Sequence, residues 1–399
     1  EPDADRRHAF CETYGIAENM AFDGWQSLFS QRRLADAVLI CTQDRMHLAP
    51  TLAAIRCGYH ILLEKPIAPL TAEIDILEDA LVGYDCVFMT GFVLRYTPFI
   101  RKIRALIDAG AIGDVMNMQL NENEGYWHHA HSYVRGQWNN ADTSSPLIVA
   151  KSCHDFDLML YLLGRHCTHI ASYGTNGYFK AANAPGNVPA RCTDGCAFAD
   201  SCKYNAVRQY TAGEGRYFVH KFGCGTEDAA IIEALRSNPY GRCVYHCDNN
   251  VCDHQVAALE FDCGFHATMA MSSECFGDNN SFEIIGTDGI LDVGDPNHFG
   301  KPLYITRKGE ERTLFPFTHP YSEQSRGIGA AELGWSIRKG RTQRLIPEMG
   351  YHALEIIEAM RECTKDNKVK TFNTKFKRPA ALSSHWYENP ETQELILAE

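Results

Sequence analysis

Two short apolar runs near the start of the chain each end in polar residues. Residues 37–40 are apolar and lead into Cys-Thr-Gln-Asp, and residues 59–63 lead into Glu-Lys-Pro at 64–66. Between them, residues 46–57 have the apolar spacing of a helix. Short buried parallel strands give this pattern, and the carboxyl ends of such strands face the ligand crevice of an α/β sheet. The pattern therefore predicts a nucleotide-binding sheet.

The alternation of strands and helices ends near residue 112, and longer alternating segments with short turns follow, as in an antiparallel sheet. We predict a doubly wound parallel sheet of the Rossmann type (1–112), an α+β domain with an open, mainly antiparallel sheet (113–379) and a tail (380–399). The predicted helices are 5–14, 25–29, 73–81 with Thr71 as its cap, 97–109, 144–164 and 347–363. The other predicted strands are 86–91, 113–124, 168–175, 254–261, 265–273, 281–293 and 303–307.

We expect the first part of a nucleotide-binding domain to be missing from the beginning of this sequence. It starts with Glu1 rather than Met, and no Gly-x-Gly-x-x-Gly follows a strand and opens a helix. One strand-helix-strand unit has roughly 30 residues, so we expect about that many to precede Glu1. Glu1 would then be the acid that binds the ribose hydroxyls of a dinucleotide.

Composition narrows the class of protein. The 399 residues suit two domains, and 38 basic against 50 acidic residues give a net charge of −12. Without a long basic run, nucleic acid is not an expected partner. No stretch reaches ~18 consecutive apolar residues, so no membrane span is expected. We expect a cytoplasmic protein, with any targeting signal lost with the missing segment.

Three motifs resemble the glucose-fructose oxidoreductase / inositol dehydrogenase (Gfo/Idh/MocA) family over residues 1–366, apart from an insertion at 180–252. They are Glu-Lys-Pro at 64–66, Gly-Phe-Val-Leu-Arg-Tyr-Thr-Pro at 91–98, and His-Asp-x-Asp at 154–157 followed by Leu-Leu-Gly. The resemblance implies NAD or NADP as cofactor and a sugar or cyclitol as substrate. It also implies cofactor contacts by Thr42, Asp44, His47, Glu64, Lys65, Pro66 and Arg95.

The chemistry of hydride transfer gives these residues roles. A hydroxyl that loses hydride also loses a proton, so it needs a base and a cation near the developing alkoxide. Lys65 can supply the cation, and His154 is the family's proton acceptor by position. On the predicted helix 144–164, Lys151 and Asp155 lie on the same face as His154. We expect Lys151 to be a catalytic partner of His154 and Asp155 to bind the substrate.

One departure from the family leaves the division of labour open. Many sugar dehydrogenases of the family have Asp four residues before the histidine, where this chain has Ala150 followed by Lys151. Lys151 acts as a base only if its surroundings lower its pKa; otherwise it is a hydroxyl or carboxylate ligand.

Residues 121–138 are rich in aromatic rings and histidines and follow a predicted strand. We interpret them as a loop that contacts the sugar, because rings cover its apolar face and polar tips bind its hydroxyls. A plain surface loop is the alternative, and the close spacing of the histidines does not favour a metal. The predicted contacts are Tyr126, His128, His131 and Arg135.

Cysteines cluster in the insertion. Three in a loop-rich stretch and one returning from a distance are typical of a structural zinc site. An iron–sulfur cluster, disulfides and free thiols stay open as alternatives. The predicted zinc ligands are Cys192, Cys196, Cys202 and Cys243, with Cys247 as an alternative to Cys243.

These features together predict an NAD(P)-dependent oxidoreductase that acts on a secondary hydroxyl of a sugar, glycoside or cyclitol. One alternative is a redox-assisted glycosidase, in which held NAD oxidises a sugar carbon, permits elimination and reduces the carbon again. The other is a non-catalytic dinucleotide-binding sensor, which the presence of both Lys65 and His154 disfavours. We also expect a homo-oligomer, because exposed faces of open sheets commonly form subunit contacts.

Overall fold

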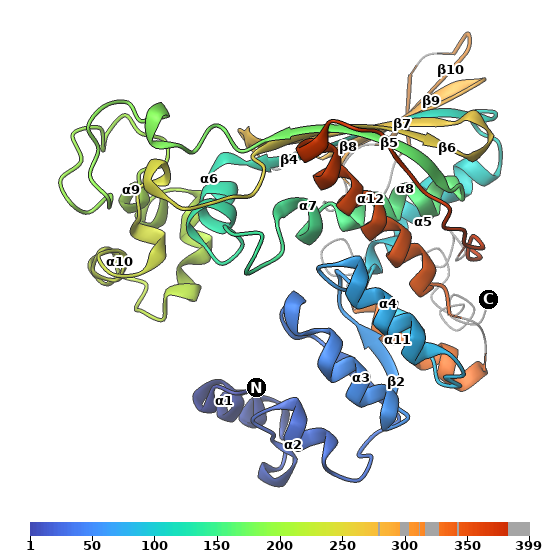
Figure 1. Ribbon diagram of the computed structural model, residues 1–399, viewed down its shortest axis with the longest axis horizontal. Helices are drawn as coiled ribbons and strands as arrows, with labels where there is room; N and C mark the ends of the chain where they lie inside the picture. Colours follow the sequence, from blue (N-terminus) through green and yellow to red (C-terminus); the bar gives the residue numbers. More distant parts are fainter. Residues whose placement is uncertain (278–279, 296–302, 311, 316–326, 341–342, 382–399) are drawn as a thin grey trace.

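The computed structural model describes residues 1–277, 280–295, 303–310, 312–315, 327–340 and 343–381. The chain forms two sheets, a parallel one of three strands and a mixed one of nine strands (Figure 1). This confirms the predicted fold class of a Rossmann-like sheet followed by a mainly antiparallel one. Most of the predicted tail lies outside the described residues.

The three strands of the first sheet are parallel and follow the order of the sequence. Leu63 and its neighbours in the middle strand are buried, which explains the continuous apolar run. The strands are β1 (Ala37–Ile40), β2 (His60–Leu63) and β3 (Phe88–Thr90). The helices of this part are α1 (Ala4–Tyr14), α2 (Trp25–Phe29), α3 (Leu48–Arg56), α4 (Thr71–Leu81) and α5 (Pro98–Asp108).

Two later helices tie the parts of the chain together. Helix α11 (Ile328–Lys339) packs on β2, and helix α12 (Pro347–Asp366) contacts both α4 and β5 of the second sheet. The prediction that Thr71 caps α4 is wrong, because Thr71 is the first residue of the helix. Its amide and hydroxyl donate to the carboxylate of Glu358 in α12, at 2.9 and 2.6 Å.

The nine-stranded sheet is built around β4, which pairs parallel with β7 and antiparallel with β8. Burial alternates along its strands because helices α8 and α12 cover one face and leave the other open (Figure 1). The strand predicted at 281–293 is two strands with a turn between them. The strands are β4 (Val115–Gly125), β5 (Cys167–Thr175), β6 (His254–Phe261), β7 (His266–Cys275), β8 (Ser281–Gly286), β9 (Gly289–Val293), β10 (Leu303–Arg307), β11 (Thr313–Phe315) and β12 (Lys370–Thr371).

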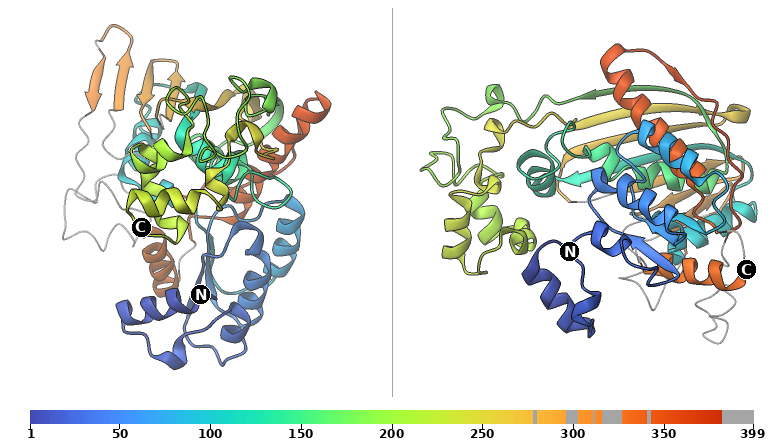
Figure 2. Two further views of the ribbon diagram at one scale, coloured as in Figure 1. Left: turned by 90° about the vertical axis from the view of Figure 1, so that its left-hand side faces the viewer. Right: turned by 60° about the horizontal axis from the view of Figure 1, so that its bottom comes forward.

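The insertion lies at the end of the sheet where β4 leads into α6 (Tyr126–His129), as Figure 2 shows. It consists of short helices and turns with small apolar clusters of their own. None of the helices in the described part of the chain is long and apolar enough to cross a membrane. The helical segments of the insertion are η5 (Ala181–Asn183), α9 (Ala206–Thr211), η6 (Glu214–Phe222), α10 (Asp228–Leu235), η7 (Pro239–Gly241) and η8 (Val244–His246).

Candidate active site

The helix predicted at 144–164 is interrupted, and the interruption forms the candidate active site. Helix α7 (Leu147–Ala150) ends before Lys151, and α8 (Cys153–Leu163) begins two residues later. At this break the amide of His154 donates to the carbonyl of Lys151, at 3.0 Å. In a continuous helix it would donate to the carbonyl of Ala150. The prediction of one helix, with Lys151 on its face, is therefore wrong.

The carbonyl of Ala150 accepts from a different part of the chain. Lys65 lies just beyond the carboxyl end of β2, and its Nζ donates to Ala150 O at 2.8 Å. A close approach of two loops supports this position, because a Cβ on Gly91 would lie 2.9 Å from Glu64 Cα. The contact places the predicted catalytic lysine of the first sheet at the break between α7 and α8.

His47 holds the loops that follow β1 and β2 together. Its ring is buried, with Nδ1 2.8 Å from the carbonyl oxygen of Pro66 and Nε2 3.0 Å from that of Thr42. Both nitrogens thus face backbone atoms of the chain. His47 therefore positions the predicted cofactor loop, and direct contact with a cofactor stays a prediction for Thr42 and Asp44.

Lys151 lies between two buried carboxylates of β4. Its Nζ is 2.5 Å from Glu124 Oε2 and 3.8 Å from Glu122 Oε1. Burial alone would lower the pKa of Lys151, but these two carboxylates raise it above its ordinary value. Lys151 consequently stays an ammonium ion at neutral pH, which excludes the role of a base.

Glu122 and Asp155 form a buried pair of carboxyl groups beside Lys151. Burial raises the pKa of Asp155 to about 6, and burial together with Asp155 raises the pKa of Glu122 well above its ordinary value. Asn280 donates to Glu122 Oε2 at 2.5 Å. The sequence prediction missed Glu122 and Glu124. The available signal was their alternation with Asn in β4, which puts two acids on the buried face.

His154 is the second residue of α8, and its ring packs edge-on against Phe92, with centroids 5.8 Å apart. Phe92 follows β3, so the ring of His154 lies against the first part of the chain. The structure thus brings Lys65, Lys151 and His154 to one place. Asp155, predicted as a substrate ligand, is buried next to Glu122 instead.

Arg95 has a different place from the predicted cofactor contact. It is 1% exposed, and its guanidinium donates to Asp157 of α8 at 2.8 Å and to the carbonyl of Arg344 at 3.0 Å. These partners occupy its donors, so Arg95 joins the two parts of the chain. The prediction that it binds the cofactor does not agree with this burial.

A cavity of about 400 Å³ lies at the carboxyl end of β1. Glu1 and Thr42 both line it, together with apolar walls from Trp25 and Leu39. This lining fits the adenosine half of a dinucleotide. The apolar wall can contact the adenine ring, and the acid can accept hydrogen bonds from the two ribose hydroxyls.

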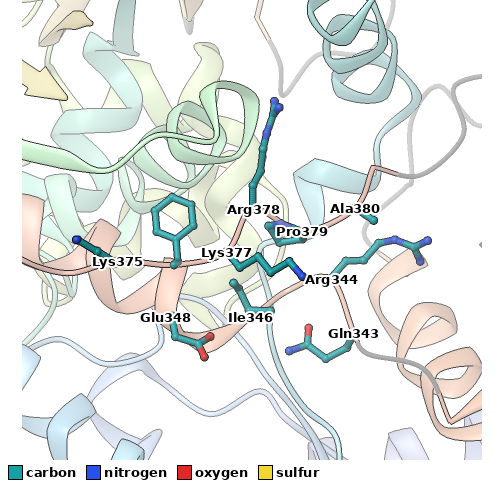
Figure 3. Close-up of a pocket in the computed structure, with 10 residues that line it drawn as sticks. Gln343, Arg344, Ile346, Glu348, Lys375, Lys377, Arg378, Pro379 and Ala380 are labelled. Carbon is teal, nitrogen blue, oxygen red and sulfur yellow. The ribbon is translucent and has the colours of Figure 1, made fainter. Parts of the chain in front are cut away.

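A larger cavity, of about 770 Å³, lies between the segment 375–380 and the residues that lead into α12 (Figure 3). Cations including Arg344 and Lys377 line it. It contains none of the residues predicted to take part in catalysis.

Residues 121–138 are not a loop. They comprise the end of β4, α6 and a π-helical segment, η4 (Ala130–Arg135). His131 is stacked between Phe218 and Tyr240, at 4.0 and 4.4 Å, and burial lowers its pKa to about 2.

Arg135 of the same segment is also buried and donates to the carbonyls of Tyr204 and Arg242, at 2.6 and 2.7 Å. The prediction that His131 and Arg135 contact the substrate is therefore wrong, because both fasten the insertion.

Tyr126 and His128 keep a position compatible with substrate contact. Both are half-buried, and His128 Nδ1 lies 2.6 Å from Glu124 Oε1, the carboxylate that holds Lys151. They thus border the charged cluster of the break. Their contact with substrate stays a prediction.

The predicted zinc site is not supported. Among the described residues, no group of three or more His, Cys, Asp or Glu side chains is placed to hold a metal ion, and Cys192, Cys196, Cys202, Cys243 and Cys247 are free thiols. A guanidinium lies among these cysteines instead, because Arg135 Nη2 is 3.7 Å from Cys192 Sγ.

Comparisons with known proteins agree with this architecture. Residues 1–92 match the model of an oxidoreductase family with an NAD-binding Rossmann fold, and residues 104–371 match that of its C-terminal alpha/beta domain. The chain belongs to the Gfo/Idh/MocA oxidoreductase family.

Individual members of the family show how far the similarity extends. The Bacillus subtilis protein YteT is 24% identical over 283 residues, which are 70% of this chain and 64% of YteT. Levoglucosan dehydrogenase of Pseudarthrobacter phenanthrenivorans is 26% identical over 147 residues, 37% of each chain. The matches thus span less than two thirds of either relative. A levoglucosan dehydrogenase solved with NADH and levoglucosan superimposes with a TM-score of 0.68 at 17% identity, over 93% of this chain and 88% of that one.

The candidate active site joins the two parts of the Gfo/Idh/MocA architecture. Lys65 and His47 fall in the matched Rossmann part, and Lys151 and His154 fall in the matched C-terminal part. The contact of Lys65 with Ala150 therefore connects them where the two parts meet.

Proposed function

We propose that this chain is an NAD(P)-dependent oxidoreductase that removes hydride from a secondary hydroxyl of a sugar, glycoside or cyclitol. The observation that carries the proposal is the junction at the α7–α8 break, where Lys65 docks on Ala150 beside Lys151 and His154. The relatives named levoglucosan dehydrogenase and myo-inositol 2-dehydrogenase support a polyhydroxylated substrate.

The side chains of the junction divide the work of removing a proton and a hydride. Lys65 stabilises the developing alkoxide, because only one of its three N–H groups is used by Ala150 O. His154 accepts the hydroxyl proton. Lys151 is a fixed cation that keeps the buried carboxylates of β4 in place and adds to the positive potential.

The cofactor would bind along the carboxyl ends of β1 and β2. Glu1, Thr42 and Asp44 would hold its adenosine half, at the cavity beyond β1. When bound, the nicotinamide supplies the hydride acceptor. Glu64 and Pro66 would shape the loop that presents Lys65 to it.

The test is formation of reduced nicotinamide by purified protein with NAD or NADP and a panel of sugars, methyl glycosides and cyclitols. We expect turnover with at least one of them, lost in His154→Gln while the melting temperature is kept. Wild-type turnover in His154→Gln would contradict the proposal. Release of free sugar from a glycoside, with co-purified NAD and no net reduced nicotinamide, would establish the redox-assisted glycosidase instead.

We also infer that two copies of the chain associate through the open face of the nine-stranded sheet. Tyr173 and Val256 form a cross-strand pair there and are 64% and 51% exposed. A second copy packed on this open face would cover both side chains. Native mass spectrometry of the wild type and of Val256→Lys tests this: we expect a dimer that the lysine disrupts, and a wild-type monomer would contradict it.

A further inference from the structure

A cluster of aromatic rings surrounds Lys203 at the edge of the insertion. The Nζ of Lys203 lies 5.1, 4.9 and 5.4 Å from the ring centroids of Tyr126, Tyr204 and Phe276. The same Nζ lies 2.7 Å from Glu274 Oε2, which also accepts from the hydroxyl of Tyr204. The insertion, α6 and the end of β7 therefore contribute to one site outside the α7–α8 break.

Two features of this cluster are not explained by folding. Phe276 is 88% exposed, although its ring lies 5.8 Å from that of Tyr126. Glu274 Oε1 is inaccessible to solvent and has no hydrogen-bond partner in the described part of the chain. The exposed ring costs free energy that a ligand can recover by covering it, whereas the buried oxygen of Glu274 lies out of reach of a ligand.

The charges of the cluster define the ligand. Lys203 already occupies the position above the rings that a cationic ligand would take, and it balances the charge of Glu274. The cluster thus has no net charge to attract an anion or a cation. It offers an exposed ring face, which suits the C–H face of a neutral pyranose ring.

The cluster is close to the candidate active site. Tyr126 is two residues after Glu124, whose Oε2 lies 2.5 Å from Lys151. Consecutive Cα atoms are about 3.8 Å apart, so the Cα atoms of Glu124 and Tyr126 are within ~8 Å. Strands β4 and β7 pair with Gly125 opposite Cys275, which brings Phe276 beside Tyr126.

We propose that Tyr126, Lys203, Glu274 and Phe276 form a second sugar subsite, which binds the non-reacting ring of a glycoside or disaccharide. Phe276 stacks on the C–H face of that ring, and the ion pair of Lys203 with Glu274 lies beside it. The other ring lies at the α7–α8 break, where it is oxidised. This inference rests on the proposed function and narrows its substrate class from single sugars to glycosides with a second ring.

The test compares matched ligands on the full chain loaded with NAD or NADP. Dissociation constants are measured by saturation-transfer NMR for methyl glycosides and disaccharides that share a sugar, such as methyl β-glucoside with cellobiose and methyl β-galactoside with lactose. We expect about tenfold tighter binding of the disaccharide in at least one pair, since covering one aromatic face contributes about that much. Phe276→Ala should remove this gain and leave the methyl glycoside unchanged.

A control variant sharpens the result. Tyr173→Ala, which removes an exposed ring on a distant strand, should change neither ligand. Equal affinity of both ligands in every pair would overturn the subsite and leave the proposed function standing. Equal weakening of both ligands by Phe276→Ala would also overturn it. If no sugar binds, the proposed function itself fails, and this inference fails with it.

Discussion

Two clusters of basic and aromatic residues lie close together in this chain and differ in how their polar groups are satisfied. We call the first the insertion seat, formed by His131, Arg135 and the residues that contact them. There Arg135 donates to the backbone carbonyl of Tyr204, and His131 Nδ1 lies 2.8 Å from the hydroxyl of Tyr210. At the α7–α8 break, the ammonium of Lys151 lies between two buried carboxyl groups. Such unbalanced, buried titratable groups are typical of active sites, whereas satisfied ones hold a fold together.

The largest effect should come from the charge at the break. Lys151→Met should reduce kcat/KM about 10³-fold, because it removes a fixed cation beside the developing alkoxide. Lys151→Arg should recover part of the activity, since it keeps the charge. Steady-state kinetics on the substrate identified in the sugar panel measures both. Unchanged turnover in Lys151→Met would contradict a catalytic role for the α7–α8 break as opposed to the structural role of the insertion seat.

A variant of the insertion seat should act on stability instead. Arg135→Met leaves the carbonyls of Tyr204 and Arg242 without their donor and should lower the free energy of unfolding by about 3 kcal/mol. Arg208→Met is the matched control, because Arg208 also donates to two carbonyls but is exposed. Denaturant unfolding and hydrogen exchange across residues 180–252 measure the change. Equal stability of the two variants would contradict the anchoring role.

The sequence predicted the fold more completely than the site. The apolar run of β2 has one interpretation because a strand buried on both faces leaves little choice of residue. The break at Lys151 could not be predicted, because it depends on Lys65, which is 86 residues earlier in the chain and bonds Ala150 O. Residue type alone also gave the wrong role for Arg135, since contact with a sugar and contact with a buried carbonyl require the same donors.

The pH dependence of stability tests the buried carboxyl pair. The folded chain keeps the proton of Asp155 up to about pH 6, whereas the ordinary value is 3.8. Because the unfolded chain binds fewer protons in this range, the free energy of unfolding falls as pH rises from about 4 to about 6. Asp155→Asn should remove the part of this fall that is due to Asp155, gaining about 3 kcal/mol relative to wild type by pH 7.

Thermal unfolding of wild type and Asp155→Asn between pH 4 and 7 measures the difference. Asp142→Asn, at an exposed carboxylate, is the control and should follow the wild type. A difference between wild type and Asp155→Asn that does not change with pH would contradict the raised pKa of Asp155.

The smallest effect should come from the tie between α4 and α12. Thr71→Val removes the hydroxyl that donates to Glu358 and keeps the hydrogen bond from the backbone amide. It should therefore lower the free energy of unfolding by about 1 kcal/mol. Thr13→Val, which removes a hydroxyl from an exposed site of α1, should cost less. The denaturant midpoints of the two variants, at an unchanged dependence of the free energy on denaturant concentration, measure the difference. An equal loss of stability in both variants would argue against a role for the contact between α4 and α12.

Chemistry at the α7–α8 break and a structural role for the insertion seat are tested together by kcat and melting temperature, measured side by side for Lys65→Met and Arg135→Met. We expect Lys65→Met to lose turnover and keep its melting temperature. We expect Arg135→Met to unfold at a lower temperature and to retain kcat below its unfolding transition. Full turnover in Lys65→Met, or lost turnover in a fully folded Arg135→Met, would contradict these expectations.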